Sequence, residues 1–594
     1  MGKWVLKRTK VNIDMMMEEF QIKRSTALAL AHRNINERGA VRRFLYETDE
    51  PTKTIHDMKD GTLAVEILEK AVREQKKIAV YGDYDVDGVT STTILVKTLR
   101  AVGGDVMYYI PDRHKEGYGL NEKAVELLHE KGVNLLMTCD NGIASIKEVS
   151  LAKTLGMEVV IIDHHEPGFI EKASGKEDVL PEADAIIDPK QSLCTYPFSL
   201  FCAAGLSYKF ALALFDKMKD TLENTKELQE ELLTFAAIGT VCDIVDLIDE
   251  NRAIVRAGLS ILKRSNNLGL QQLVEKNGAS LPNIEEYHIG FVIGPCINAA
   301  GRLENGKEAV DLFLTEDIAE ASPIAESLVA LNTERKRLTL EGTERLLAKV
   351  ESQEKDKILV LYDEETNESV AGIIAGRIKE TYNHPTIVIT KSGEFAKGSG
   401  RSIEGYDLFL GLFAHKELFL RFGGHPMAAG FSLEVENIDV LRNKLNADCT
   451  LEEDDFLPIN RIDQILDFSD ISMDLVEELR GLAPFGKGNP KSLFASTNIE
   501  VSRFSIIGKN KNVLKFALRD PISDVRISAI SFDGLNSFIE LLKELYNEEK
   551  CAILLETGKL DVCIDFVYTL DINTYNGASS VQLLIKDFRP SKQS

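Results

Sequence analysis

The sequence predicts an α/β protein in which a parallel-sheet domain and a second, smaller α/β domain are joined by a long connecting helix and followed by a C-terminal β-barrel. Strand-like apolar runs alternate with amphipathic helices between residues 56 and 260, which is typical of a parallel sheet with helices on its faces. A charged helical stretch runs from about Ala325 to Glu351, and short β-type segments typical of a small barrel follow residue 490. A chain of 594 residues also exceeds what one hydrophobic core supports, so several domains are expected.

The first half of the chain is expected to contain a helical lead-in and the parallel-sheet domain. Residues 1–55 form the lead-in, with the clearest helix at Ser25–His32. Residues 56–260 form the parallel-sheet domain, with helices at Thr90–Arg100, Glu122–Glu130 and Ser145–Leu155. The expected strands of this domain are Lys77–Tyr81, Val106–Ile110, Asn134–Cys139, Glu158–Ile162 and Ala183–Ile187.

The second half is expected to contain a helical connection and two further domains. Residues 261–350 include the linker helix, residues 351–455 form the second α/β domain, and residues 456–594 form the barrel. In the second domain a strand at 357–362, a helix at 370–381 and a strand at 386–390 precede glycine-rich turns. The expected barrel strands are Ile499–Ile507, Val513–Leu518, Val525–Phe532, Asp561–Tyr568 and Val581–Ile585.

Composition narrows the class of protein. No run of about 18 apolar residues is present, and nothing after Met1 resembles a signal peptide, so we expect a cytoplasmic protein without a membrane span. The eight cysteines contain no CxxC pair and are expected to be reduced thiols. The net charge of −24 disfavours a general attraction to nucleic acid, so any such binding needs local positive charge.

Acidic residues follow several of the expected strands. Asp83, Asp85 and Asp87 come directly after the strand that ends at Tyr81, and a cluster of carboxylates is costly unless a cation neutralises it. Further candidate ligands also follow apolar stretches, and in parallel sheets such strand ends meet at one edge. They are Asp140, the Asp163-His164-His165 run and Asp243. Oxygen-rich ligands with imidazole favour Mn²⁺ or Mg²⁺ over structural zinc.

Two simpler interpretations compete with this metal site. The Asp83–Gly88 segment has the spacing that opens an EF-hand calcium loop, but the glutamate required at the end of that loop is absent. The other interpretation is a solvated turn. A buried, unpaired Asp243 within an apolar run would nevertheless be expensive, which favours a metal ligand.

Candidate anion-binding segments lie further along the chain. Asn298–Arg302, Lys397–Ser402 and Arg421–Pro426 combine small residues with arginine or histidine, a combination that suits phosphate contacts. The barrel region carries basic residues interleaved with two aromatic residues, which is typical of a single-strand-binding face; a solvated β-face is an equally good interpretation. The basic residues are Arg503, Lys509, Lys511, Lys515 and Arg519, and the aromatic ones are Phe504 and Phe516.

These motifs together resemble the DHH phosphoesterase superfamily, and specifically the bacterial RecJ type of single-strand-specific exonuclease. The resemblance covers nearly the whole chain. It rests on YGDYDVDGVTST (81–92), TCDNG (138–142), IIDHHEP (161–167), the Asp243 segment, INAAGRLENG (297–306), GSGRS (398–402), GGHPMAAG (423–430), PFGKGNP (484–490) and an OB-like C-terminal region.

The resemblance implies a role for each matching residue. Asp83 and Asp85 would hold one Mn²⁺ or Mg²⁺ ion, Asp87, His164 and Asp243 a second, and Asp140 would bridge the two ions. His165 would face the scissile phosphate. The second α/β domain would be of the DHHA1 type. Strand and 5′-phosphate contacts would come from Arg113, Ser399, Arg401 and Ser402, and the cleft lining from Asn298, Arg302 and His425.

The chain departs from the family pattern at two places. Cys296 stands where the family usually has arginine, and Asn367–Gly372 lacks the usual His-x-Gly-Val. Neither departure touches an expected metal ligand.

The resemblance implies a metal-dependent 5′-to-3′ exonuclease that degrades single-stranded DNA in repair and recombination, working as a monomer alongside a helicase and a single-strand-binding protein. Two alternatives remain at this point. One is a small-substrate DHH hydrolase, which would have no use for a barrel that guides a strand. The other is an inactive scaffold, which is disfavoured because every expected ligand is present.

Overall fold

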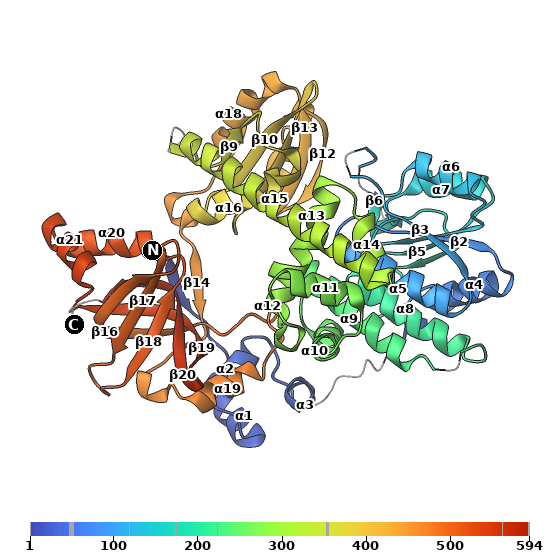
Figure 1. Ribbon diagram of the computed structural model, residues 1–594. Helices are drawn as coiled ribbons and strands as arrows, with labels where there is room; N and C mark the ends of the chain where they lie inside the picture. Colours follow the sequence, from blue (N-terminus) through green and yellow to red (C-terminus); the bar gives the residue numbers. More distant parts are fainter. Residues whose placement is uncertain are drawn as a thin grey trace.

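The computed structural model describes residues 2–46, 53–113, 115–117, 119–172, 175–222, 224–351, 356–560 and 562–591. Figure 1 shows the parallel-sheet domain and the C-terminal barrel on opposite sides, with the second α/β domain above them. Residues 47–52 of the expected lead-in and the expected strand start at Asp561 fall outside the described residues.

The first sheet confirms the predicted, mostly parallel sheet: all its strands are parallel, in the order β3-β2-β4-β5-β8. Alternate side chains point to opposite faces. Ile78 and Val80 pack on one side with helices α5 (Val86–Ala101) and α8 (Ala203–Lys217), while Ala79 and Tyr81 pack on the other with α6 (Glu122–Glu130) and α7 (Ile146–Thr154). The strands are β2 (Lys77–Tyr81), β3 (Asp105–Tyr109), β4 (Leu135–Cys139), β5 (Glu158–Ile162) and β8 (Ala185–Ile187).

A helical region connects this domain to the next. Its last helix, α15 (Ile318–Val350), contains 33 residues and confirms the predicted connecting helix. Leu328 of α15 is buried in the core of the first domain and Leu346 in that of the second, so one helix belongs to both (Figure 1). The preceding helices are α9 (Lys226–Cys242), α10 (Asp249–Leu262), α11 (Leu268–Lys276), α12 (Glu286–His288), the π-helical turn η3 (Ile289–Ile293), α13 (Gly294–Leu303) and α14 (Lys307–Leu314).

The second α/β domain has a mixed sheet in the order β12-β13-β11-β10-β9, backed by α16 (Glu368–Tyr382). The glycine-rich segments that we expected to be turns are antiparallel strands, because their residues pair in register with neighbouring strands. The strands are β9 (Leu359–Tyr362), β10 (Thr386–Ser392), β11 (Phe395–Arg401), β12 (Phe419–His425) and β13 (Ala428–Leu433).

The C-terminal strands close into the predicted five-stranded barrel, because β16 pairs with both β17 and β19. Phe504 and Phe516 are only 2% and 1% exposed, and both rings pack against Phe538 of α20 (Leu535–Leu545). Neither interpretation of these two rings, as part of a single-strand-binding face or of a solvated face, holds, because both rings belong to the barrel core. The strands are β16 (Phe494–Ile507), β17 (Val513–Arg519), β18 (Arg526–Ser531), β19 (Cys563–Tyr575) and β20 (Ala578–Pro590).

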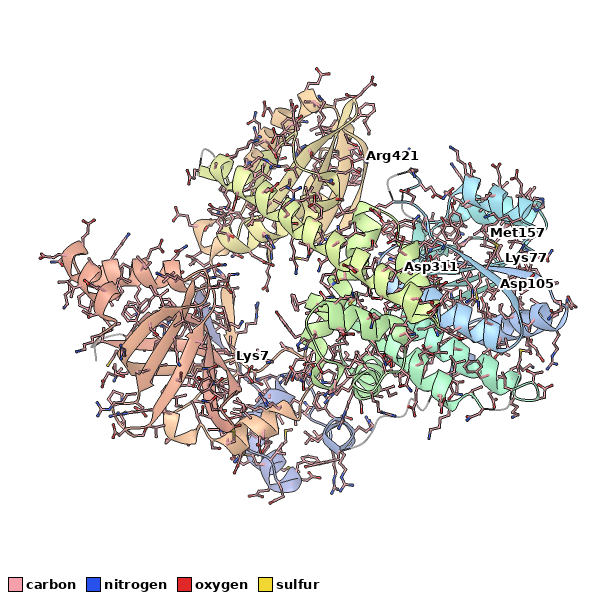
Figure 2. All side chains as sticks on the ribbon, viewed as in Figure 1. Lys7, Lys77, Asp105, Met157, Asp311 and Arg421 are labelled. Carbon is pink, nitrogen blue, oxygen red and sulfur yellow. The ribbon has the colours of Figure 1, made fainter. Side chains whose placement is uncertain are left out.

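The N-terminal segment belongs to the barrel side of the molecule. Its first strand, β1 (Lys3–Leu6), pairs in parallel with β14 (Ile459–Ile462), a long-range contact that the sequence did not reveal. Figure 2 shows Lys7, next after β1, on the edge of the barrel region that faces the central helices. The predicted helices of the lead-in follow, as α1 (Ile13–Phe20), α2 (Arg24–Ala31) and α3 (Arg38–Tyr46). Over the ranges that the structure describes, every helix is too short or too polar to cross a bilayer.

Candidate active site

The predicted acidic residues meet at the carboxyl edge of the parallel sheet. Asp83 and Asp85 lie in the turn between β2 and α5, and Asp87 lies in the first turn of α5. Asp140 follows β4, both histidines follow β5, and Asp243 follows α9. Their side-chain atoms fall into three groups, each lying within 4.8 Å. The groups are Asp83, Asp85 and Asp140; Asp87, His164 and Asp243; and Asp140, His164 and His165.

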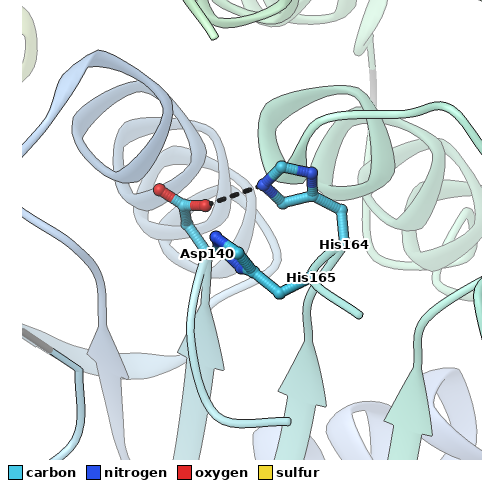
Figure 3. A group of neighbouring side chains, drawn as sticks. All are labelled: Asp140, His164 and His165. Atoms are coloured by element: carbon cyan, nitrogen blue, oxygen red, sulfur yellow. Dashed lines mark hydrogen bonds and ion pairs between the residues drawn. The ribbon is translucent and has the colours of Figure 1, made fainter. Parts of the chain in front are cut away.

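Asp140 stands at the centre of this cluster. It belongs to two of the three groups, and its Oδ1 lies 3.1 Å from Nε2 of His164 (Figure 3). Its φ of 62° is in the left-handed region, which aspartate and asparagine tolerate better than most residues. That turn directs the carboxylate across the ends of the strands.

Local hydrogen bonds hold the other carboxylates. Asp85 caps α5 by accepting a hydrogen bond from the backbone N–H of Gly88. Asp87 accepts from the backbone N–H groups of Ala203 and Ala204, at 2.7 and 2.9 Å, at the start of α8. These bonds fix the carboxylates before any ion binds, so the site is pre-organised.

The carboxylates raise one another's pKa values. Burial, followed by repulsion from neighbouring aspartates, raises the pKa of Asp87 to about 6 and that of Asp243 to about 7. The same causes raise the pKa values of Asp83 and Asp140 well above the ordinary range. Burial lowers the pKa of His164, which favours the neutral imidazole that binds metals.

The residues present fit a divalent cation. Oδ1 of Asp83 is buried and has no hydrogen-bond partner among the described residues, which is costly for a carboxylate oxygen. Positive charge at the centre would satisfy that oxygen and relieve the mutual repulsion. A set of carboxylates with one imidazole suits Mn²⁺ or Mg²⁺.

We expect the metal-free protein to become more stable as the pH falls from about 8 to about 6. Over this range Asp87 and Asp243 take up protons in the folded state, while in the unfolded chain they stay ionised, because their ordinary pKa is about 4. The folded state then binds more protons, so acidification favours it. Thermal unfolding in EDTA at several pH values measures the trend. An Asp243→Asn variant should show a weaker trend, and an equally steep one would contradict this assignment.

His165 is oriented by the buried carboxylate of Asp163. Its Nδ1 lies 2.7 Å from Oδ1 of Asp163, which also accepts from the backbone N–H of His164. Burial lowers the pKa of His165, but the bond to Asp163 and the attraction of nearby aspartates outweigh it and raise the pKa to about 9. The raised pKa favours the imidazolium form of His165 at neutral pH, and the bond to Asp163 fixes the orientation of its ring.

A basic pocket of about 500 Å³ borders the carboxylate cluster. Tyr84, which stands between Asp83 and Asp85, forms part of its wall, and the guanidinium of Arg113 lies over the Tyr84 ring at 5.3 Å. Figure 2 places Arg421 on the side of the second domain that faces the parallel sheet. The cations of the wall are Arg113, Arg302, Lys397, Arg401 and Arg421, and the one carboxylate, Glu368, is hydrogen-bonded to Lys397. Such a pocket suits an anion.

The structure brings four of the seven predicted substrate contacts to this pocket: Arg113, Arg302, Ser399 and Arg401. Ser402 lies elsewhere, since it is buried and its hydroxyl donates to the carbonyl of Tyr406. His425 is exposed at the end of β12 and lies outside the pocket wall. Asn298 is also absent from the wall; it lies on α13, one turn before Arg302.

Sequence reasoning missed several polar pocket residues, among them Tyr84, Arg421 and Ser369. Tyr84 was hidden among the aspartates, Arg421 was counted only as part of a glycine-rich segment, and Ser369 lies in the stretch that departs from the family pattern. The carbonyl of Ser369 accepts a hydrogen bond from Arg302 at 2.9 Å. The other departure, Cys296, is fully buried beside Asn277 and Asn332.

Gly301 explains the small residues of the INAAGR segment. A Cβ at this position would lie 2.3 Å from the carbonyl oxygen of Tyr84, so α13 packs directly on the turn that carries the aspartates.

We expect Gly301→Ala to destabilise the protein by about 1–3 kcal/mol, because an overpacked contact forces the backbone to move. It should also weaken Mn²⁺ binding, measured by calorimetry. A matched Gly376→Ala change on α16, where a Cβ would meet no atom closer than 4.0 Å, controls for replacing a helical glycine. Unchanged Mn²⁺ affinity in Gly301→Ala would contradict the coupling.

Comparisons with known families match three segments of the chain. The DHH family N-terminal domain matches residues 77–240, the DHHA1 domain residues 355–450, and the RecJ OB domain residues 462–587.

Whole proteins match over most of their length. The single-stranded-DNA-specific exonuclease RecJ of Bacillus subtilis is 36% identical over 98% of this chain and 70% of its own. The enzyme of the same name from Haemophilus influenzae is 32% identical over 92% of this chain and 95% of its own. A crystal structure of RecJ from Thermus thermophilus in complex with Mn²⁺ aligns with a TM-score of 0.80 at 26% identity, covering 100% of this chain and 80% of that one.

Proposed function

This chain belongs to the RecJ family of single-stranded-DNA-specific exonucleases and hydrolyses single-stranded DNA, and we propose that it does so from the 5′ end with two divalent metal ions. Relatives from Thermus thermophilus have been solved with Mn²⁺ and with Mg²⁺. The carboxylates and His164 described above supply a donor set for such ions.

The observation that carries this proposal is the contact between the basic pocket and the carboxylate cluster. Tyr84 belongs to the wall of the pocket and stands between two of the aspartates. A terminal phosphate held by the arginines would therefore lie close to the edge of the cluster. The next phosphodiester along the strand could then reach the aspartates, as cleavage from an end requires.

Each residue of the site has a distinct task in this mechanism. Asp83 and Asp85 would hold one ion, Asp87, His164 and Asp243 the other, and Asp140 would bridge them. Bound ions would polarise the phosphodiester and supply hydroxide near neutral pH. His165, oriented by Asp163, would hold a proton close to the scissile phosphate. Arg401 would bind the terminal phosphate, and Arg302, which remains charged with a pKa lowered by burial to about 10, would neutralise the strand.

The wider biological role extends this proposal. We place the enzyme in DNA repair and recombination, acting as a monomer on strands that a helicase exposes and a single-strand-binding protein covers. The domain boundaries proposed from the sequence, near residues 55, 260, 350 and 455, leave the carboxylate cluster in one domain and most of the basic pocket in another.

A digest of end-labelled DNA tests the proposal. Single-stranded and double-stranded oligonucleotides, labelled at each end in turn, are incubated with Mn²⁺, Mg²⁺ or EDTA. We expect metal-dependent release of the 5′ label as a mononucleotide from single strands alone. Release from the 3′ end would overturn the polarity. Turnover of dinucleotides without digestion of long strands would instead identify a small-substrate hydrolase.

A further inference from the structure

Two neighbouring aromatic side chains are exposed on the helical region. Tyr287 on α12 and Phe291 on η3 are 60% and 66% exposed, and their rings stack with centroids 4.9 Å apart at an angle of 24°. On the opposite side of the same segment, Ile289 and Ile293 are fully buried. Exposing two large rings together is unfavourable in water, so this pair is suited to contact another flat apolar group.

The buried side of residues 287–293 lies against the end of α9, where the ligand Asp243 follows. The thiol of Cys242 donates a hydrogen bond to the carbonyl of Ile289 over 3.6 Å, and Cys242 directly precedes Asp243. The segment is also π-helical from Ile289 to Ile293, a distortion that occurs frequently at functional sites. The segment that carries the aromatic pair therefore contacts, through Ile289, the residue that directly precedes the ligand Asp243.

The same helical run also reaches the basic pocket. It continues through α13 to Arg302, so that Phe291 and Arg302 are about 16 Å apart along a helix with about 1.5 Å per residue. Consider a strand whose 5′ end lies in the basic pocket and whose next phosphodiester lies at the aspartates. The nucleotides that follow this phosphodiester would then be able to reach the exposed side of this helical run.

Other exposed groups near Asp243 support a strand-binding surface. Ile244 is 67% exposed and has a φ of 59°, a strained conformation for a β-branched residue. The loop at 484–490 contacts both sides of this surface: the N–H of Phe485 donates to Glu286, and the carbonyl of Lys487 accepts from the N–H of Leu247. In this loop the ammonium of Lys487 is exposed and lies 3.9 Å from a carboxylate oxygen of Asp246, three residues after Asp243.

We propose that Tyr287 and Phe291 form a stacking platform for unpaired bases of the DNA strand downstream of the scissile phosphate. This inference rests on the proposed function and identifies how the bases, rather than the phosphates, are held. Phe504 and Phe516 of the barrel cannot take this role, because both rings are buried.

The test combines protein variants with abasic DNA. Binding of a fluorescent 5′-phosphorylated oligonucleotide is measured by anisotropy in EDTA, so that the strand stays intact. We expect Tyr287→Ala/Phe291→Ala to weaken binding about tenfold, in line with about 1–3 kcal/mol for each stacked base. A series of oligonucleotides is then compared, each with a short abasic stretch at a different position. The wild type should bind more weakly only to those in which the abasic stretch falls where the bases would stack on the two rings. The double variant should be insensitive to the abasic stretch there, because the same contact is already lost.

Two further variants separate stacking from damage to the fold. Phe291→Trp should keep wild-type affinity and sensitivity to abasic sites, and Tyr382→Ala, which removes an exposed ring at the far end of α16, should bind as the wild type does. The platform is overturned if the double variant binds within about twofold of wild type, or if its affinity falls equally for intact and abasic strands. If the wild type itself neither binds nor digests single strands, the proposed function fails instead.

Discussion

Replacing Asp140 with asparagine is expected to abolish DNA hydrolysis while making the metal-free protein more stable. Asparagine has the same shape and tolerates the φ of 62°, whereas alanine would add strain there. Loss of a bridging carboxylate should cost several kcal/mol of transition-state stabilisation, or about a thousandfold or more in rate. Stability should rise because one of several mutually repelling buried charges is removed.

The two effects of Asp140→Asn are measured separately. Initial rates on a labelled single strand give the activity, and thermal unfolding in EDTA at neutral pH gives the stability. Addition of Mn²⁺ should stabilise the wild type more than the variant, because binding to the folded state raises its stability in proportion to affinity.

Asp184, which directly precedes β8 and so lies at the amino-terminal end of that strand, provides a matched control. Asp184 pairs with Lys153 and accepts from the backbone N–H of Val159, so it is satisfied in the fold. Asp184→Asn should leave hydrolysis unchanged and lower stability, the opposite pattern. Substantial activity in Asp140→Asn, or a lower melting temperature in EDTA, would disprove the central position of Asp140.

Replacing Arg401 with alanine is expected to remove the preference for 5′-phosphorylated ends. The Arg401 guanidinium lines the basic pocket, held by the carbonyl of Gly400 and close to Ser399. A hydrogen bond to a charged group contributes about 1.5–3 kcal/mol, so kcat/KM on phosphorylated ends should fall roughly 10- to 100-fold. On unphosphorylated ends it should change much less, because the lost interaction is with the phosphate.

The measurement is the ratio of kcat/KM for the two kinds of end. Arg401→Lys should give an intermediate ratio, since lysine keeps the charge but lacks the forked donors. Arg442→Ala is the matched control, because Arg442 lies in the same domain and binds the carbonyl of Val360 away from the pocket. A ratio in Arg401→Ala equal to that of the wild type would exclude the phosphate role.

Gly372 shows how closely this arginine is fitted. A Cβ at Gly372 would lie 2.7 Å from Oγ of Ser399 and 2.8 Å from Nη2 of Arg401. The stretch that departs from the family pattern therefore still supplies the space that the arginine needs. Its sequence alone gave no indication of this, because the contact joins a helix to a strand in a different part of the domain.

The carboxylate cluster could be predicted from the sequence because it depends on local patterns. Each ligand follows an apolar run, and parallel strands place their carboxyl ends along one edge whatever the details of packing. Asp83, Asp140 and His164 needed only the correct assignment of three strands to be brought together. The long helix α15 and the closed barrel were predicted for the same reason, since periodicity identifies elements.

Contacts between distant segments could not be predicted in this way. The pocket around Tyr84 exists because α15 holds two cores at a fixed separation, and Phe504 is buried because α20 fills the end of the barrel. The exposed pair Tyr287 and Phe291 has ordinary helical spacing, which in a sequence suggests a buried face. The sequence determined which chemistry is present and at which strand ends, since hydrophobic periodicity acts over a few residues. Only the tertiary structure decided which side chains face solvent, the anion pocket or the core, because that depends on how whole elements pack together.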